Sequence, residues 1–241
     1  MTIFQTLKEY CIRIYIFLIR GRINRHYLQK HYLHGEGIEI GALHNPLRLA
    51  SHVKVKYVDR LSNEVLREHY PELQKFNLVH VDIIDDGETL GTIANHSQDF
   101  VIANHFLEHC QNPILAIENM VRVVKKTGVV FMVIPDKRYT FDVERPVTTI
   151  EHLSDDYNNG PQHSQFSHFE EWVRIIGKIN DPKEIERHIK SLQQTKYSIH
   201  FHVWTQQEIL ELLLMMRKKI DVEIELFFKN EGECICVLKK N

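Results

Sequence analysis

The chain has 241 residues, of which 43% are hydrophobic and 26% are charged. This composition is typical of a folded globular protein with one large domain and a sizeable core, and it excludes a repeat array, a disordered chain and a small disulfide-bonded scaffold. The net charge of −2 gives no global basic field, so we expect no nucleic-acid partner. The four cysteines form no CxxC pair, which favours reduced thiols and a cytoplasmic location.

Residues 1–34 differ from the rest of the chain in their charge. Basic side chains strongly outnumber the single acid Glu9, and apolar side chains recur at helical spacing from Phe4 to Leu18. The range 1–34 is therefore predicted to be a basic amphipathic helical segment, and its charges interrupt it too often for it to cross a membrane. Two roles remain open: the segment caps the sheet of the following domain, or it makes a peripheral contact with a membrane surface.

From residue 35 onward, short apolar runs alternate with helical patterns, which is typical of an α/β domain. One helix is predicted over 114–124, and a capping box at 205–208 starts another. The predicted strands cover residues 38–41, 53–58, 78–81, 100–103, 129–134, 222–228 and 234–238. We expect five βα repeats followed by a hairpin formed by the last two strands.

Residues 136–204 break this alternation. They contain Pro146, the pair Gly160 and Pro161, and a high density of polar side chains. We therefore predict one domain over residues 35–241 with a lid or insertion at about 136–204.

Polar residues and one glycine follow the first three predicted strands. Gly41 stands at the turn after the first strand, where a glycine lets the backbone approach a ligand. Asp59 ends the second strand and is placed to accept the two hydroxyls of a ribose. Asp82 ends the third strand, where its carboxylate and the backbone amide of Ile83 would meet an adenine. Together these positions predict a nucleoside slot at the carboxyl ends of the strands.

The chain resembles the class I S-adenosylmethionine-dependent methyltransferases over about residues 36–136. The run 39–41 resembles the family's first motif, the stretch 99–109 resembles its fourth-strand motif, and 125–136 resembles its turn and fifth strand. The resemblance implies a Rossmann-like, doubly wound, seven-stranded and mostly parallel sheet with a C-terminal antiparallel hairpin strand. The chain departs from the family after Gly41, where Ala42, Leu43, His44 and Asn45 replace the usual further glycines.

The resemblance also implies the cofactor and the residues that hold it. The cofactor is S-adenosyl-L-methionine, and its expected contacts are Glu39, Gly41, Ala42, Asn45, Asp59, Arg60, Asp82, Ile83, Asn104 and His105. Because the first motif keeps only one glycine, a second interpretation remains open, namely a catalytically silent domain that binds a nucleoside or a partner.

Methyl transfer needs an in-line nucleophile and, for a hydroxyl, a base. His105 and Glu108, just beyond the fourth strand, are the expected catalytic residues. We expect a small or glycan-like polar acceptor because polar and aromatic side chains gather in residues 136–204. The expected substrate residues are Arg138, Tyr139, His152, His168, His200 and His202. We assign no metal ligand, although His200 and His202 with His152 or Asp156 remain an alternative. The sequence assigns no oligomeric state.

Overall fold

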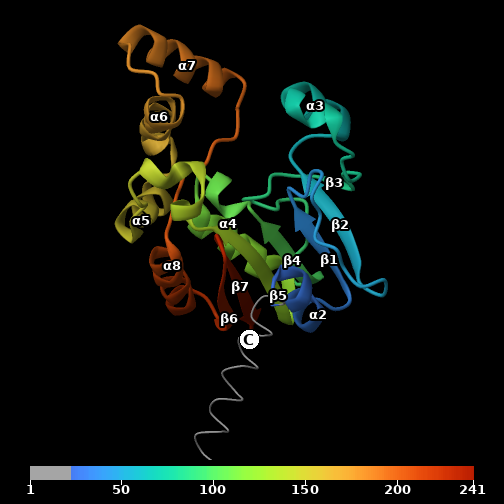
Figure 1. The fold of residues 1–241 in the computed structure, drawn as a ribbon. Helices are drawn as coiled ribbons and strands as arrows, with labels where there is room; N and C mark the ends of the chain where they lie inside the picture. Colours follow the sequence, from blue (N-terminus) through green and yellow to red (C-terminus); the bar gives the residue numbers. More distant parts are fainter. Residues whose placement is uncertain (1–22) are drawn as a thin grey trace, which may run out of the picture.

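The computed structural model describes residues 23–241, and the predictions made for residues 1–22 lie outside this range. A seven-stranded sheet has the order β3-β2-β1-β4-β5-β7-β6 (Figure 1). The strands β1 to β5 pair in parallel, and β7 is antiparallel to both β5 and β6. The bounds are β1 Glu36–Ile40, β2 Lys54–Asp59, β3 Ile83–Ile84, β4 Gln98–Asn104, β5 Val124–Pro135, β6 Val222–Asn230 and β7 Glu233–Lys240. The predicted fold class, including the antiparallel hairpin, is confirmed.

Helices begin where the sequence supplies a side chain that accepts a hydrogen bond from a free backbone amide. Asn112 caps α4 with Pro113 in its first turn, and the capping box of Thr205 and Glu208 starts α8. The helices are α2 Arg25–Tyr32, α3 Asn63–His69, α4 Pro113–Val123, α5 Ile150–Asn159, α6 Gln162–Glu171, α7 Pro182–Gln194 and α8 Gln206–Lys219. Short helical turns cover Pro71–Lys75, Leu107–His109, Lys137–Tyr139, Phe141–Glu144 and Trp172–Ile176. Among these described elements, no helix is long and apolar enough to cross a membrane.

The prediction of five βα repeats is wrong in two places. Within the described chain, β1 and β2 are joined by a loop without a helix, and so are β3 and β4. The third strand is also displaced: residues 78–81 are not a strand, and β3 is the two-residue segment Ile83–Ile84. The apolar run that suggested residues 78–81 instead lies beside the loop after β1, with the Val79 amide bonded to the Leu43 carbonyl.

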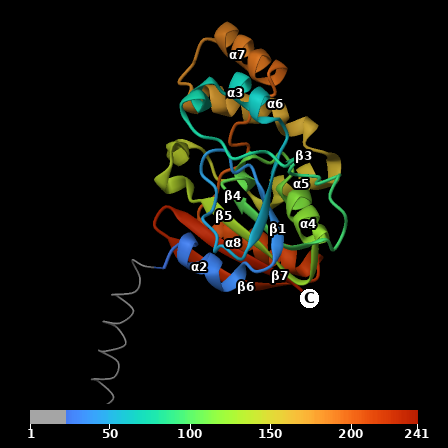
Figure 2. The same cartoon turned by 90° about the vertical axis from the view of Figure 1, so that its right-hand side faces the viewer.

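The two faces of the sheet are covered differently (Figure 1 and Figure 2). Helices α4 and α8 pack the larger core cluster, with residues such as Ile117 and Leu213 against the strands. On the other face, Leu28 and Leu33 of the α2 region pack with Leu47, Phe100 and other strand residues. The described end of the basic N-terminal segment therefore packs against the sheet, whereas the amphipathic stretch 4–18, to which the two predicted roles apply, lies outside the described residues.

Residues 136–204 fold as a helical insertion between β5 and α8. Helices α6 and α7 have a small core of their own, made by Phe169, Val173, Ile185, Ile189, Ile199 and Phe201. Figure 2 shows α6 and α7 together with α3 beyond the carboxyl ends of the strands. The Arg60 guanidinium, just after β2, donates to the Lys196 carbonyl at 2.9 Å and to the Tyr70 hydroxyl at 2.7 Å. The insertion is thus tied to the β2 side of the sheet.

Candidate active site

The turn after β1 is held in place by a buried carboxylate. Both oxygens of Glu39 accept the Leu47 amide, at 3.0 and 3.2 Å, and the Asn104 amide group donates to Glu39 at 3.4 Å. Burial raises the pKa of Glu39 to about 7, against the opposing effect of these hydrogen bonds. Glu39 and Asn104 therefore shape the loop that follows Gly41.

Within this loop the backbone bends at two positions of positive φ. Gly41 has a φ of +65°, and Leu43 has a φ of +50° where the family would place a glycine. A turn closed by the Asn45 amide and the Ala42 carbonyl, at 2.9 Å, follows Gly41. A side chain at Gly41 would meet nothing closer than Phe106 at 3.9 Å, so the backbone conformation, rather than crowding, requires glycine here.

Asp59 stands at the end of β2, beside this turn. Its carboxylate accepts the Leu61 amide at 3.3 Å, and burial raises its pKa. The remaining lone pairs of the carboxylate are suited to hydroxyl donors such as those of a ribose. Arg60 does not share this role, because its guanidinium is engaged by Lys196 and Tyr70.

The prediction for the adenine contacts needs correction. Asp82 precedes β3 instead of ending it, and its carboxylate accepts the Tyr57 amide of β2 at 2.8 Å. Ile83 pairs with Val58 inside the sheet. The residues beyond β3 are Asp85 and Asp86, and both carboxylates accept amides of their own loop.

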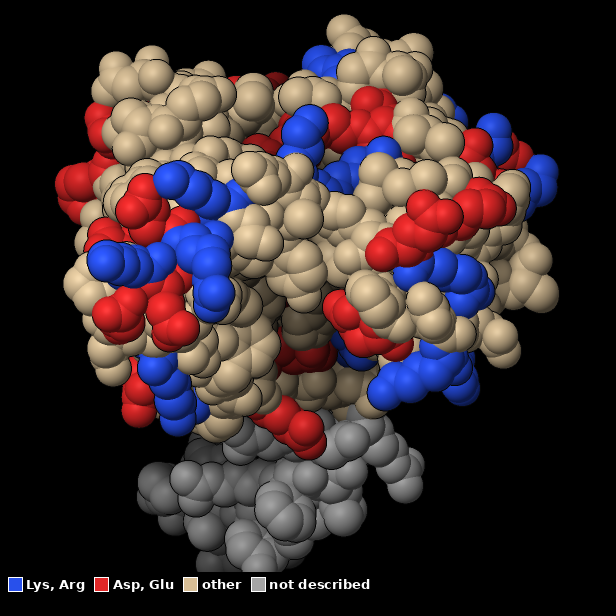
Figure 3. Space-filling model, turned by 90° about the horizontal axis from the view of Figure 1, so that it is seen from above, with Lys and Arg blue, Asp and Glu red and all other residues tan. Residues whose placement is uncertain are grey.

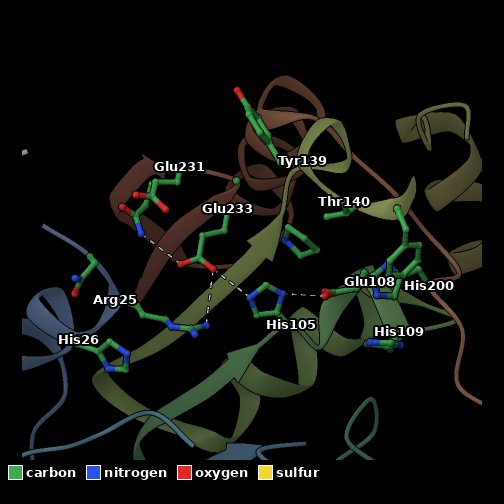
Figure 4. A pocket seen from close by; sticks show the side chains of 15 residues that line it. Arg25, His26, His105, Glu108, His109, Tyr139, Thr140, His200, Glu231 and Glu233 are labelled. Carbon is green, nitrogen blue, oxygen red and sulfur yellow. Dashed lines mark hydrogen bonds and ion pairs between the residues drawn. The ribbon is translucent and has the colours of Figure 1, made fainter. Parts of the chain in front are cut away.

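A pocket of about 670 Å³ opens at the carboxyl ends of β4 and β5 and at the β6–β7 turn (Figure 4). Of the predicted substrate residues, Tyr139 and His200 line it, and both predicted catalytic residues do so as well. Its lining is Asn24, Arg25, His26, His105, Glu108, His109, Pro135, Tyr139, Thr140, Phe141, His200, Asn230, Glu231, Gly232 and Glu233. Basic and acidic side chains are interspersed on the face seen from above, which is hollowed near its middle (Figure 3).

His105 lies between two carboxylates. Its Nε2 is 3.1 Å from Glu233, its Nδ1 is 3.5 Å from Glu108, and its backbone has a φ of +49° (Figure 4). Burial disfavours the charged ring, but the two carboxylates outweigh burial and raise the pKa of His105 to about 9. The charged imidazolium form is therefore favoured at neutral pH, and in this form both ring nitrogens are hydrogen-bond donors.

The carboxylate of Glu108 is surrounded by the imidazoles of His105, His109 and His200. The side chain is buried, and neither carboxylate oxygen has a hydrogen-bond partner among the described residues. Burial disfavours the charge of Glu108, yet His105, His109 and His200 together keep its pKa below the usual value. An ionised carboxylate with free lone pairs thus faces the pocket.

The two other imidazoles have defined tautomers, because each Nδ1 faces an oxygen that only accepts. His109 Nδ1 donates to the Ile199 carbonyl at 2.9 Å, and burial lowers the pKa of His109. His200 Nδ1 donates to the Asp142 carboxylate at 2.7 Å. In the neutral rings, each Nε2 is then an acceptor. Sequence reasoning did not assign His109 to the site, although its spacing of four residues from His105 was a usable signal.

The other predicted substrate residues lie outside this pocket. Arg138 is paired with Asp136 through two hydrogen bonds, at 2.9 and 2.5 Å. His152, His168 and His202 gather around Asp156 between α5, α6 and the segment that precedes α8. Sequence reasoning also missed Arg25 and Glu233, since nothing in the local pattern shows that α2 and the β6–β7 turn meet the end of β4.

The comparisons with known proteins agree with this geometry. Residues 35–132 match the family model described as a methyltransferase domain. A solved structure from Rhodobacter sphaeroides, whose description names Zn-dependent alcohol dehydrogenases, shares the fold with 16% identity, 92% coverage of each chain and a TM-score of 0.52. SAM-dependent methyltransferases from Methanosarcina mazei and Aquifex aeolicus match with 17% and 11% identity and a TM-score of 0.48 each. The match to the Methanosarcina mazei structure covers 90% of this chain and 98% of that protein. The match to the Aquifex aeolicus structure covers 92% of this chain and 90% of that protein. No curated protein matches the chain.

The strand order is that of a Rossmann-like fold, and the turn at Gly41 and the acid at Asp59 suit a nucleoside cofactor. Residues 35–132 match the methyltransferase-domain family, and the fold of the described chain is compatible with that match. The open turn at Gly41 and the Asp59 carboxylate fit S-adenosylmethionine, the methyl donor that the descriptions of the neighbouring methyltransferases name. This cofactor supplies an electrophilic methyl group, and the chain's own residues supply the acceptor pocket.

Proposed function

We propose that the chain methylates a hydroxyl group of a small, glycan-like acceptor bound in the pocket beside His105. The observation that carries this proposal is the Glu108 carboxylate, which is buried, ionised and without a hydrogen-bond partner among the described residues. A buried carboxylate without a hydrogen-bond donor destabilises the folded chain, and a bound ligand that donates a hydrogen bond removes this cost. A hydroxyl of the acceptor is a donor of the required size and polarity.

The chemistry of the step follows from the surrounding groups. The acceptor oxygen forms a bond with the methyl carbon, the bond between that carbon and sulfur breaks, and its electron pair stays on sulfur. The hydroxyl donates its hydrogen bond to Glu108, and its proton passes to this carboxylate, beside which Asp142 holds His200 through Nδ1. The charged His105 orients Glu108 and offsets its negative charge.

The rim of the pocket supports a sugar-like acceptor. Tyr139 and Phe141 are 59% and 56% exposed, and both line the pocket. Exposed aromatic rings offer apolar faces to the C–H groups of a sugar ring, while the carboxylates and imidazoles meet its hydroxyls. The pocket volume of about 670 Å³ is sufficient for a small saccharide.

The experiment uses the full chain, S-adenosylmethionine with a labelled methyl group, and separate panels of saccharides, phenols and amines. We expect label on a saccharide hydroxyl, identified by mass spectrometry. Glu108→Gln should lower kcat at least 100-fold and leave cofactor binding intact, whereas the exposed Glu186→Gln on α7 serves as the matched control. Label found only on amines or phenols would overturn the proposed acceptor class.

A further inference from the structure

Four potential metal ligands from three segments meet inside the insertion. His152 and Asp156 are one helical turn apart on α5, His168 lies on α6, and His202 lies in the segment before α8. Their ligand atoms all lie within 4.8 Å of one another. None of these four residues lines the pocket of about 670 Å³ that contains Glu108, although the His202 amide bonds to the Glu108 carbonyl at 3.3 Å.

The distances between the atoms point to a common centre. His152 Nε2 is 3.0 Å from His168 Nε2 and 3.2 Å from Asp156 Oδ2. His202 Nε2 and His168 Nε2 are 3.7 and 3.9 Å from the same carboxylate oxygen. Four ligands at about 2.0–2.1 Å from a tetrahedral Zn²⁺ are separated from one another by roughly 3.4 Å. The observed separations lie on both sides of this value.

Three of the four side chains in this cluster are buried, and some of their polar atoms lack a hydrogen bond. Asp156 and His202 are fully buried, and His168 is 9% exposed. Asp156 Oδ2 and His202 Nδ1 have no hydrogen-bond partner among the described residues. Three imidazoles converge on one carboxylate oxygen, so a metal ion would satisfy Asp156 Oδ2, which hydrogen bonding leaves without a partner.

The surroundings of the cluster also suit a metal site. The Ser164 hydroxyl donates to the other oxygen, Asp156 Oδ1, and so fixes the orientation of the carboxylate. Such outer hydrogen bonds are typical of metal ligands in proteins. His202 Nε2 is 3.3 Å from the Gln111 carbonyl, a long contact that it would give up on binding a metal.

We propose that His152, Asp156, His168 and His202 bind a divalent transition metal ion, with Zn²⁺ the best match to three imidazoles and one carboxylate. Four protein ligands leave no open position at a tetrahedral ion, so the site is structural. The ion joins α5, α6 and the segment that leads into α8. The alternative metal set considered from the sequence shares His152, Asp156 and His202 with this cluster, whereas its fourth member, His200, bonds to Asp142 instead.

The test is metal analysis of the full chain purified from zinc-supplemented medium, without a histidine tag. We expect one zinc per chain, a lower Tm after chelation and recovery of the Tm on adding Zn²⁺. Co²⁺ added to the metal-free chain should give the intense visible bands of a tetrahedral site.

Variants separate metal binding from folding. His152→Ala changes a side chain that is 36% exposed and should abolish zinc binding while the chain stays folded by circular dichroism. Ser164→Ala should weaken zinc affinity by about 10–100-fold, and the exposed His52→Ala is the matched control. A folded wild-type chain that carries no zinc, and whose Tm and visible spectrum do not respond to Zn²⁺ or Co²⁺, would overturn the proposal. Because the readouts are metal content, Tm and spectrum, they are independent of methyl transfer.

Discussion

The charge on His105 makes a measurable contribution to stability that depends on pH. The folded-state pKa of about 9 lies above the ordinary value of 6.5, because Glu108 and Glu233 outweigh the effect of burial. Stability from this group is therefore fully present below about pH 6.5 and is lost as the pH rises through 9. The difference corresponds to roughly 3 kcal/mol, which 43% exposure of the side chain reduces to about 1–2 kcal/mol.

The variant His105→Asn isolates this contribution. Asparagine tolerates the positive φ of this position and carries no charge. We expect the free energy of unfolding in urea to fall by about 1–2 kcal/mol more for the wild type than for the variant between pH 6 and 10. Lysine, tyrosine and cysteine titrations are common to both chains and cancel in the comparison. If the difference between the two chains does not change with pH, His105 is not held charged and the reasoning is refuted.

Three further predictions concern the cofactor side and the core. Asp59→Ala should weaken S-adenosylmethionine binding by about 10–100-fold in isothermal titration, since hydrogen bonds to a charged group contribute roughly 1.5–3 kcal/mol; unchanged affinity would contradict the ribose assignment. Arg60→Ala should speed tryptic cleavage after Lys196, because the bond to that carbonyl is lost, and equal cleavage rates would show that this contact does not hold the insertion. Leu213→Ala, on the core-facing side of α8, should lower the free energy of unfolding in urea by about 2–5 kcal/mol, and a decrease under 1 kcal/mol would show that α8 packs loosely.

The sequence was sufficient to predict the elements whose signals are local. The capping box at Thr205 and the apolar runs of the central strands follow from short-range patterns, and the structure confirms them. The third strand failed because it is only two residues long, so an apolar run next to it gave a stronger signal. Whether such a short edge strand forms depends more on its pairing with the neighbouring strand than on the β-propensity of its residues.

The positions of Gly41 and Asp59 at the ends of β1 and β2 were predictable, because they follow from the local strand pattern. The site was not predictable where a residue's role depends on a partner far away in the sequence. Glu233 reaches His105 across 128 residues and acts together with the nearby Glu108 in raising the pKa of that histidine. The histidines of the insertion could be recognised as a group, but only the fold separates His200 from His202.

The bond between Arg60 and Lys196 has a consequence for the order of events during turnover. Arg60 directly follows the acid expected to hold the ribose, and Lys196 belongs to the insertion that supplies Tyr139, Phe141 and His200 to the acceptor pocket. A displacement of the β2 end on loading the methyl donor would be transmitted to the acceptor's side through this bond and through the ring contact between Tyr70 and Tyr197. We expect compulsory-order kinetics, with the donor binding first and its demethylated product leaving last.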